Sequence, residues 1–383
     1  MEREPETAEQ PKAVAEPEAA PEPDNDRDLP DFSALGGRDI GAPPPLRLDV
    51  NNGPEPPPGF VPALTRRLQA LHRYGPETAE ELRTRLADVL SGCGGRGVTA
   101  DNVVVGAGSM TLLRLAVEEA RAARRHVIAQ VPGYAGFRRL CAALDTPLTT
   151  VPRSPDFGTN EEALRDAILG SSASGAMVCL NHPVNPIGVP EDLASIDRLL
   201  AEYPDTVILI DEAYAEFHEG PGALATSVHA GSESLIVTRS FSKARALAGI
   251  RLGYAVTGTE RARRWRSAML PGSVSALTQA AALAALDEHP DDFDTRMRRM
   301  RAERDRLAAA LQPTLGAPLP ATANFLTFPM GPRTAQVVGQ ARTNGIAIRA
   351  IEDEPGLPSC VRITVGTREE NDRLVAVLAD ASH

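Results

Sequence analysis

A short stretch of the sequence, residues 239–253 (RSFSKARALAGIRLG), brings together three kinds of side chain that can act on a ligand. Ser240 and Ser242 supply hydroxyl groups, Lys243 an amine and Arg251 a guanidinium group. Hydroxyl and guanidinium groups bind anions, whereas a deprotonated amine can form a Schiff base with a carbonyl carbon. The stretch is therefore typical of a site for an anionic ligand with a reactive carbonyl group.

The lysine is unusual for this composition. Of the 40 basic residues, 38 are arginines, and the other lysine, Lys12, lies in a leader rich in Pro and Glu. Arginine can replace lysine where only charge is needed, but its guanidinium stays protonated and does not form a Schiff base. We therefore interpret Lys243 as a reactive residue, with a lysine retained by chance as the alternative.

Polar residues also follow two other apolar runs. After VVV comes a glycine turn that ends in Gly108 and Ser109, which favours either a tight turn capped by Ser109 or an anion site at a helix start. After VILI comes Asp211, with Tyr214 three residues later. The position of Asp211 is compatible with a metal ion, a ribose, a protonated ring nitrogen or a helix cap, and these interpretations stay open.

These residues need elements that bring them together, and the hydrophobic pattern predicts a sheet. Short runs rich in Val and Ile alternate with helical stretches, as expected for parallel strands that are buried on both faces. The expected strands are 102–108 (running into the glycine turn), 126–131, 175–180, 206–211, 234–240 and 251–256. Because sites in such sheets form beyond the carboxyl ends of the strands, we expect the polar residues to meet there.

The C-terminal part has a different pattern, with a long charged helix over 291–312 and short strands within 324–330, 346–351 and 361–366. The predicted fold class is α/β: a large domain with a mostly parallel sheet sandwiched by helices, plus a smaller α+β domain. We predict a disordered acidic leader, an arm that joins the small domain, the large domain and the small domain, at residues 1–40, 41–60, 61–275 and 276–383.

Composition narrows the class of protein. Residues 1–30 hold ten acids and three bases, so −7 of the net charge of −11 belongs to them and −4 to the other 353 residues. Because the charges of residues 31–383 nearly balance, there is no reason to expect nucleic acid as a partner. The leader lacks a signal-peptide core, and no run of about 18 apolar residues predicts a membrane span.

The cysteines and histidines also bear on the location of the protein and on metal binding. The four cysteines lie far apart without CxxC spacing, so we expect free thiols in a reducing cytoplasm. The seven histidines show no ligand spacing, and no metal is expected.

Taken together, the sequence resembles the fold-type I pyridoxal 5′-phosphate enzymes, specifically class I and II aminotransferases, and within them the histidinol-phosphate aminotransferase family. The resemblance runs from about residue 46 to the C-terminus, with eight motifs in the family's order. They are RYGPETAEELRTRLA, VVVGAGS, VPGYAGF, NHPVNPIG, VILIDEAYAEF, SFSKARALAGIRLGYAV, ANFLTF and VRITVGTREEN. The resemblance implies an enzyme that uses pyridoxal 5′-phosphate, works as a homodimer and is cytoplasmic.

The resemblance implies roles around the cofactor ring. Lys243 would bind the cofactor as a Schiff base and then move a proton between substrate and cofactor. Asp211 would pair with the protonated pyridine nitrogen, which lets the ring withdraw electrons. Asn185 and Tyr214 would hydrogen-bond the phenolic oxygen, and Tyr134 would stack on the ring.

The resemblance also implies residues at the two ends of the ligand. The cofactor phosphate would be bound by Gly108, Ser109, Met110, Ser240, Ser242 and Arg251. Tyr74 would reach the phosphate in the neighbouring subunit, and Arg362 would bind the carboxylate or phosphate of the substrate. Arg349, Asn324 and Asn185 are expected beside the substrate. Packing roles for the two tyrosines, Tyr74 and Tyr134, and structural or solvated positions for the two arginines, Arg362 and Arg349, are the alternatives.

Some positions depart from the family's motifs near the expected substrate. Gly53 replaces an aromatic or amide side chain, Gly75 replaces a proline, and Arg245 and Ala246 replace a Phe-Gly pair. NHPVNPIG stands where the family has Asn-Pro-Asn-Asn-Pro-Thr-Gly. None of these changes touches the lysine chemistry. They make an amino acid of specialised metabolism as good a candidate substrate as histidinol phosphate.

The predicted function is transfer of an amino group from an amino acid, or an amino-alcohol phosphate such as histidinol phosphate, to a 2-oxo acid. The alternative keeps the cofactor but breaks another bond, as in threonine-phosphate decarboxylases or in elimination and cyclisation enzymes. A cofactor-binding regulator without catalysis is a third possibility. Such regulators usually carry a basic helix-turn-helix module, and the leader here is acidic.

Overall fold

The central element is a seven-stranded sheet in the order β2-β8-β7-β6-β5-β3-β4. The computed structural model describes residues 46–379, except for 54, 55, 58, 93, 96, 172–174 and 228. The predicted leader and the first part of the predicted arm lie outside the described residues. The strands are β2 (Val103–Gly106), β3 (His126–Val131), β4 (Leu148–Pro152), β5 (Ala176–Asn181), β6 (Val207–Asp211), β7 (Leu235–Ser240) and β8 (Gly253–Val256).

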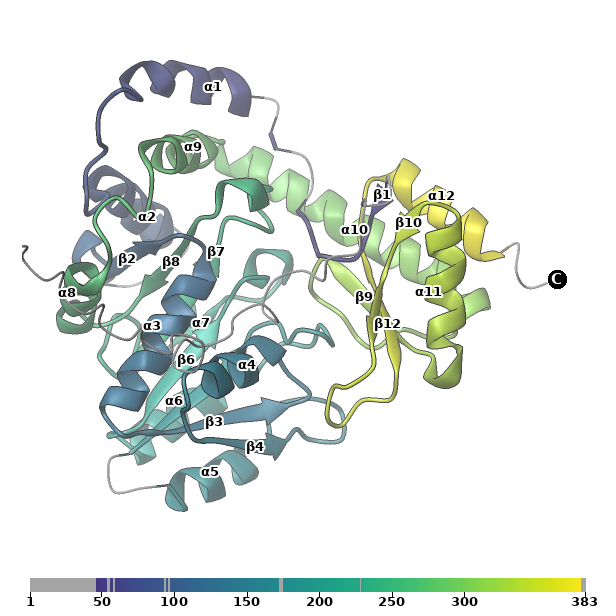
Figure 1. Cartoon of the computed structure of the whole chain (residues 1–383), viewed down its shortest axis with the longest axis horizontal. Coiled ribbons are helices and arrows are strands. Elements are labelled where there is room, and N and C mark those ends of the chain that lie inside the picture. Colours follow the sequence, from purple (N-terminus) through teal and green to yellow (C-terminus); the bar gives the residue numbers. More distant parts are fainter. Residues whose placement is uncertain are drawn as a thin grey trace, which may run out of the picture. The chain divides into compact units, whose positions relative to one another are not determined.

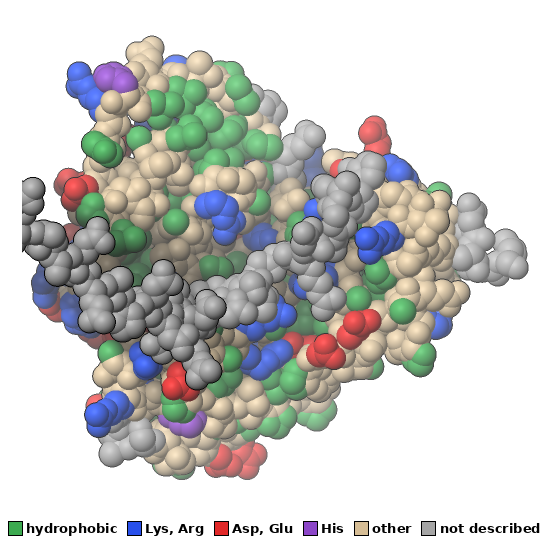
Figure 2. Space-filling view, in the orientation of Figure 1, with side chains coloured by type: hydrophobic (Ala, Val, Ile, Leu, Met, Phe, Trp, Pro, Cys, Tyr) green, Lys and Arg blue, Asp and Glu red, His purple; other side chains and the backbone are tan. Residues whose placement is uncertain are grey.

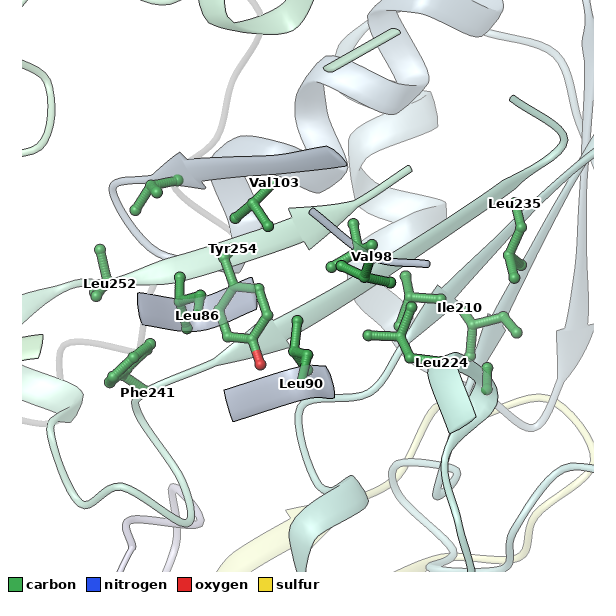
Figure 3. Packing of buried hydrophobic residues seen from close by; sticks show 14 of the residues in the cluster. Leu86, Leu90, Val98, Val103, Ile210, Leu224, Leu235, Phe241, Leu252 and Tyr254 are labelled. Atoms are coloured by element: carbon green, nitrogen blue, oxygen red, sulfur yellow. The ribbon is translucent and has the colours of Figure 1, made fainter. Parts of the chain in front are cut away.

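Helices cover both faces of this sheet (Figure 1). Alternate side chains of one strand point to opposite faces, so Val103 and Val105 of β2 pack in one core and Val104 in the other. The first core also contains side chains of α1 (Phe60–Arg67), α2 (Glu80–Gly92), α5 (Glu161–Leu169), α6 (Leu193–Glu202), α7 (Ala223–Thr226) and α9 (Ala276–Leu286). The second contains α3 (Ser109–Ala122), α4 (Ala135–Ala143) and α8 (Thr259–Ala268). Figure 3 shows part of the first core, where Leu86 and Leu90 lie near Tyr254 of β8.

The C-terminal part forms a separate hydrophobic core around an antiparallel sheet in the order β11-β12-β9. Its elements are α10 (Pro290–Leu315), β9 (Phe325–Pro329), α11 (Thr334–Thr343), β10 (Ile346–Ala347), β11 (Arg349–Ile351), β12 (Cys360–Thr364) and α12 (Arg368–Ala379). The N-terminal strand β1 (Leu46–Arg47) pairs in parallel with β10, and Leu46 and Leu48 pack in this core. The predicted domain boundaries stay a prediction.

The predicted fold class is confirmed, with two differences in detail. Strand β4 was not expected, because its pattern is that of a partly exposed edge strand with two threonines rather than a continuous apolar run. Strand β8 runs antiparallel to both neighbours, while the other neighbouring pairs are parallel. The short connection from β7 to β8 contains no long crossover helix, so the chain returns in the opposite direction.

Within the part of the chain that the structure describes, no helix is both long and apolar enough to span a bilayer. Cys141, Cys179 and Cys360 are buried free thiols, whereas Cys93 lies outside the described residues. Among the same residues, no cluster of His, Cys, Asp and Glu side chains has the arrangement of a metal site.

Candidate active site

A cavity of about 650 Å³ lies where the carboxyl ends of β5, β6 and β7 face the start of α3. Its other walls come from residues 49–52, from the loop after β11 and from Arg362 of β12. Most of the predicted site residues line it: Ser109, Met110, Tyr134, Asn185, Asp211, Tyr214, Ser240, Ser242, Lys243, Arg251, Arg349 and Arg362. Gly108, Tyr74 and Asn324 are the predicted residues that do not.

The amine of Lys243 faces this cavity from the loop after β7. Its Nζ donates a hydrogen bond to the backbone oxygen of Val50, 2.9 Å away, and lies 5.6 Å from the centre of the Tyr214 ring. Burial lowers the pKa of Lys243 to about 7, helped by the charges of Arg362 and Arg251 and opposed by Asp211. A large fraction of this amine is therefore neutral near pH 7, which is the nucleophilic form.

The carboxylate of Asp211 ends strand β6 and is buried. Its Oδ1 accepts a hydrogen bond from Thr238 Oγ1 of β7 at 3.0 Å. Burial raises the pKa of Asp211 to about 6, while the bonds from Thr238 and from the Ala213 backbone N–H oppose that change. A buried carboxylate held in this way is suited to pairing with a cationic group of a ligand.

The end of the cavity at α3 is suited to an anion. Gly108, with φ of 84°, caps α3, and a Cβ atom there would lie 2.8 Å from Arg251 Nη2. Glycine therefore lets the guanidinium approach the helix start, whose first backbone N–H groups have no partner within the helix. Arg251 Nη1 also lies 3.5 Å from Ser242 Oγ, and Ser240 Oγ accepts from the Ser242 backbone N–H at 3.1 Å.

Tyr134 forms a side wall whose position is fixed at both ends. Its backbone N–H donates to Asn181 Oδ1 at 2.9 Å, and its hydroxyl contacts Met110 Sδ at 3.1 Å. Its ring meets Phe137 edge-on, with 5.8 Å between ring centres. Burial raises the pKa of the Tyr134 phenol, so the ring stays neutral and presents a flat surface to the cavity.

On the wall formed by β12, Arg362 connects three parts of the chain. Its Nη1 donates to Asn185 Oδ1 at 2.7 Å and its Nη2 to the Asp49 backbone oxygen at 3.0 Å. Its Nε is buried without a hydrogen-bond partner in the structure. Arg349 lies directly across the strand pair from Arg362 and lines the same cavity. Two guanidinium groups at this wall suit a second anionic group on a ligand.

Residues 49–52 form one wall through their backbone. Four consecutive carbonyl oxygens each accept a hydrogen bond from a side chain far away in the sequence. Arg362 donates to residue 49, Lys243 to residue 50, and Asn324 Nδ2 to residues 51 and 52, at 3.4 and 2.9 Å. The side chain of Asn51 also donates to the Tyr214 hydroxyl at 3.0 Å. This segment therefore fixes the position of several site residues at once.

Besides Gly108, two predicted residues do not line the cavity. Asn324 is buried behind residues 51 and 52 and contacts the wall rather than the cavity. The side chain of Tyr74 is fully exposed at the surface.

Sequence reasoning missed some residues that shape the site. Asn51, Thr238 and Asn181 are buried polar residues bonded to Tyr214, Asp211 and Tyr134. Asn181 carried a recognisable signal, since it directly follows the predicted strand 175–180, and it ends β5 in the structure. Asn51 and Thr238 carried none, because their roles depend on contacts with residues 163 and 27 positions away.

Comparison with known proteins gives a consistent result. The family model described as aminotransferase class I and II matches residues 46–378. A histidinol-phosphate aminotransferase from Mycobacterium sp. (strain JLS) is 33% identical over 362 residues, which cover 92% of this chain and 94% of the relative.

Solved structures agree in fold. Histidinol-phosphate aminotransferase from Sinorhizobium meliloti, in complex with pyridoxal-5′-phosphate, is 25% identical, with a TM-score of 0.76 over 88% of this chain and 91% of that one. L-threonine-O-3-phosphate decarboxylase from Porphyromonas gingivalis is 22% identical, with a TM-score of 0.73 over 88% and 98%.

The chain therefore belongs to the class I and II aminotransferases. It is a pyridoxal-phosphate-dependent aminotransferase that acts on small amino and keto compounds. The residues of the cavity fit this cofactor chemically. A glycine-capped helix start with two serines and Arg251 suits its phosphate, the buried Asp211 suits its ring nitrogen, and Lys243 offers an amine to its carbonyl carbon.

Proposed function

We propose that this enzyme transfers the amino group of a donor that carries an anionic group to a 2-oxo acid. The donor is an amino acid or an amino-alcohol phosphate such as histidinol phosphate. One observation carries the proposal: the Lys243 amine faces a cavity whose two ends, at Arg251 and at Arg362, each suit an anion. The cofactor phosphate would bind at the first end and the substrate's carboxylate or phosphate at the second.

Each group around the amine has a task that its surroundings support. Bound pyridoxal phosphate supplies a carbonyl carbon and an electron-withdrawing ring. Lys243, with its pKa lowered to about 7, would offer its amine to that carbon, and the same amine would be placed to accept and return the substrate's proton. Asp211 would favour a proton on the ring nitrogen, because its buried carboxylate favours a cation beside it.

Other residues of the cavity would contact the phenolic oxygen and the ring face of the cofactor. Asn185 is oriented by Arg362, and Tyr214 by Asn51, so both can hydrogen-bond this oxygen. Tyr134 would pack on the ring, and its own position is fixed by Asn181 and Met110.

We further propose that the working unit is a homodimer in which Tyr74 reaches the partner's phosphate site. Its full exposure supports this role. Other large apolar side chains are exposed nearby in sequence or on neighbouring elements, namely Val61, Leu71, Leu270 and Leu277. Figure 2 shows hydrophobic side chains gathered over α1 and α9 on the face that it presents. The cytoplasmic location stays a prediction.

A donor screen tests the function. The holoenzyme is mixed with single amino acids or with histidinol phosphate, and conversion of the cofactor to its aminated form is followed by absorbance. The proposal expects conversion by at least one such donor and release of the matching oxo compound. Release of CO₂ in place of an oxo product would instead establish a decarboxylase.

A further inference from the structure

The turn that carries Lys243 is held by contacts from three directions. Inside the turn, the Ala246 backbone N–H donates to the Lys243 oxygen at 3.0 Å. From one side, the backbone of Gly53 packs so closely that a Cβ atom there would lie 1.6 Å from the same oxygen. From the other side, Arg296 Nη1 donates to the oxygen of Ala244 at 3.0 Å.

Arg296 is itself fixed by a buried carboxylate. Its Nε and Nη2 donate to the two oxygens of Glu288 at 3.0 and 2.9 Å, in a bidentate pair. The Glu288 side chain is only 3% exposed and lies in the short connection between α9 and α10. A bidentate pair with a nearly buried carboxylate fixes the direction of the guanidinium, so the third bond, to Ala244, is fixed as well.

Arg245, one residue after Ala244, joins the same group. Its Nη1 lies 3.6 Å from Glu288 Oε2, and its guanidinium carbon lies 3.8 Å from the centre of the Phe293 ring. Phe293 and Arg296 are three residues apart on α10, so they share one helix face toward the Lys243 turn. Arg245 stands where the family has an aromatic residue. Arg245 therefore brings a positive charge to the Lys243 turn, close to Glu288.

The turn needs this outside support. Ala246 has φ of 57°, a left-handed conformation that is unfavourable for a residue with a Cβ and costs glycine little. The turn therefore carries backbone strain. External contacts then decide where the Lys243 backbone lies.

We propose that Glu288, acting through Arg296 and Arg245, is a positioning residue that holds the Lys243 peptide so that its amine reaches the cofactor. We call Arg245, Glu288, Phe293 and Arg296 the Glu288 clamp. None of the four lines the cavity, so the clamp acts through the backbone of residues 243–246 and touches neither cofactor nor substrate. This inference rests on the proposed role of Lys243.

The test measures how fast Lys243 captures the cofactor. Pyridoxal 5′-phosphate is added to cofactor-free enzyme, capture is followed by absorbance, and borohydride then fixes the product for peptide mapping. In Glu288→Gln, which keeps the shape but removes the charge, we expect capture to slow by about tenfold, because a misplaced nucleophile loses reactivity steeply. In the holoenzyme, kcat falls by a similar factor, with KM for the donor little changed. Capture within twofold of the parent rate overturns the proposal.

Glu119→Gln is the matched control. Glu119 also holds a nearly buried arginine, Arg261, at 3.0 Å, but between α3 and α8, away from the Lys243 turn. We expect both variants to lose some thermal stability and only Glu288→Gln to slow the capture of the cofactor. Equal slowing in both variants also overturns the proposal. If even the parent chain incorporates no pyridoxal at Lys243, the proposed role of that lysine fails first, so the two failures are distinguishable.

A second pair of variants keeps the test decisive if Glu288→Gln folds poorly. Arg245→Leu keeps an apolar side chain beside Phe293 and removes the guanidinium group, and we expect a smaller slowing of capture. Arg296→Gln removes the bond to Ala244, and combining it with Glu288→Gln should add little further slowing, because the two residues act as one unit. Fully additive effects would show that Glu288 does not work through Arg296.

Discussion

The two ends of the active-site cavity are built in different ways. At the proposed cofactor end, Asp211 and Ser240 end strands of the seven-stranded sheet, and Ser109 begins helix α3. At the proposed substrate end, the groups come from the segment 49–52 and from β11 and β12, and the bond from Arg362 to residue 49 spans 313 residues of sequence.

This difference suggests that one end of the cavity determines the reaction and the other determines which substrate is used. Strand ends of one sheet share an edge whatever the loops contain, so the cofactor end follows from the fold alone. The substrate end depends on how the C-terminal sheet and the N-terminal segment meet, through bonds that no local pattern encodes. Substitutions at the proposed cofactor end should therefore abolish the reaction, whereas substitutions at the proposed substrate end should change which substrates react.

The largest effect is expected for Lys243→Ala. Without the amine, turnover should fall by about four orders of magnitude or more, because the covalent route is lost. The absorbance of the lysine-bound cofactor should disappear while circular dichroism stays native. A variant with an unchanged visible spectrum would refute the assignment of Lys243.

Asp211→Asn should be the next most severe change. The amide keeps the size and the Thr238 contact but cannot balance a protonated ring nitrogen, so turnover should fall by about a hundredfold. Cofactor binding, measured by absorbance after gel filtration, should persist. Near-normal turnover would show that this carboxylate does not act on the ring.

Gly53→Ala connects the two ends, since Gly53 lies between the wall segment and the Lys243 turn. A Cβ atom 1.6 Å from the Lys243 oxygen must displace backbone, which should lower the free energy of unfolding by about 1–3 kcal/mol and weaken cofactor binding. Gly339 is the control, because a Cβ there meets nothing and the position is helical. Gly339→Ala should raise stability slightly. Urea denaturation of both variants checks the opposite signs.

The smallest effect concerns pH. Because the pKa of Lys243 is lowered from 10.5 to about 7, capture of added cofactor should rise with pH around a midpoint near 7. Arg362→Gln removes one of the charges that lower this pKa, so its midpoint should move upward. Folded protein binds this proton more weakly than unfolded protein, so the cofactor-free enzyme should gain stability as pH rises from about 7 toward 10.5. A capture midpoint near 10 would contradict this electrostatic picture.

How much could be predicted from the sequence differs in the same way between the strand ends of the large sheet and the contacts made across the chain. Continuous apolar runs predicted β2, β3, β5, β6 and β7 and their strand-end residues, because burial on both faces leaves a plain pattern. The direction of β8 was not predictable from its apolar run, since both directions bury the same side chains.

At the site, candidate residues with unusual chemistry could be predicted from the sequence, whereas the hydrogen bonds that hold them in place could not. Lys243 was identified because arginine replaces lysine in nearly every other position. The bond from Asn51 to Tyr214 joins residues that only the folded chain brings together. Asn324 was expected beside the substrate, and it lies behind the wall because its amide bonds to backbone at residues 51 and 52.

To Arg362, Lys243 and Asn324, the wall at residues 49–52 offers only peptide oxygens, and every amino acid possesses one. Arg362, Lys243 and Asn324 would find the same acceptors after almost any substitution along it that keeps the backbone path. Apart from Asn51, whose side chain holds the Tyr214 hydroxyl, such a wall can vary its side chains during evolution, and so adapt to new substrates, without dismantling the machinery behind it.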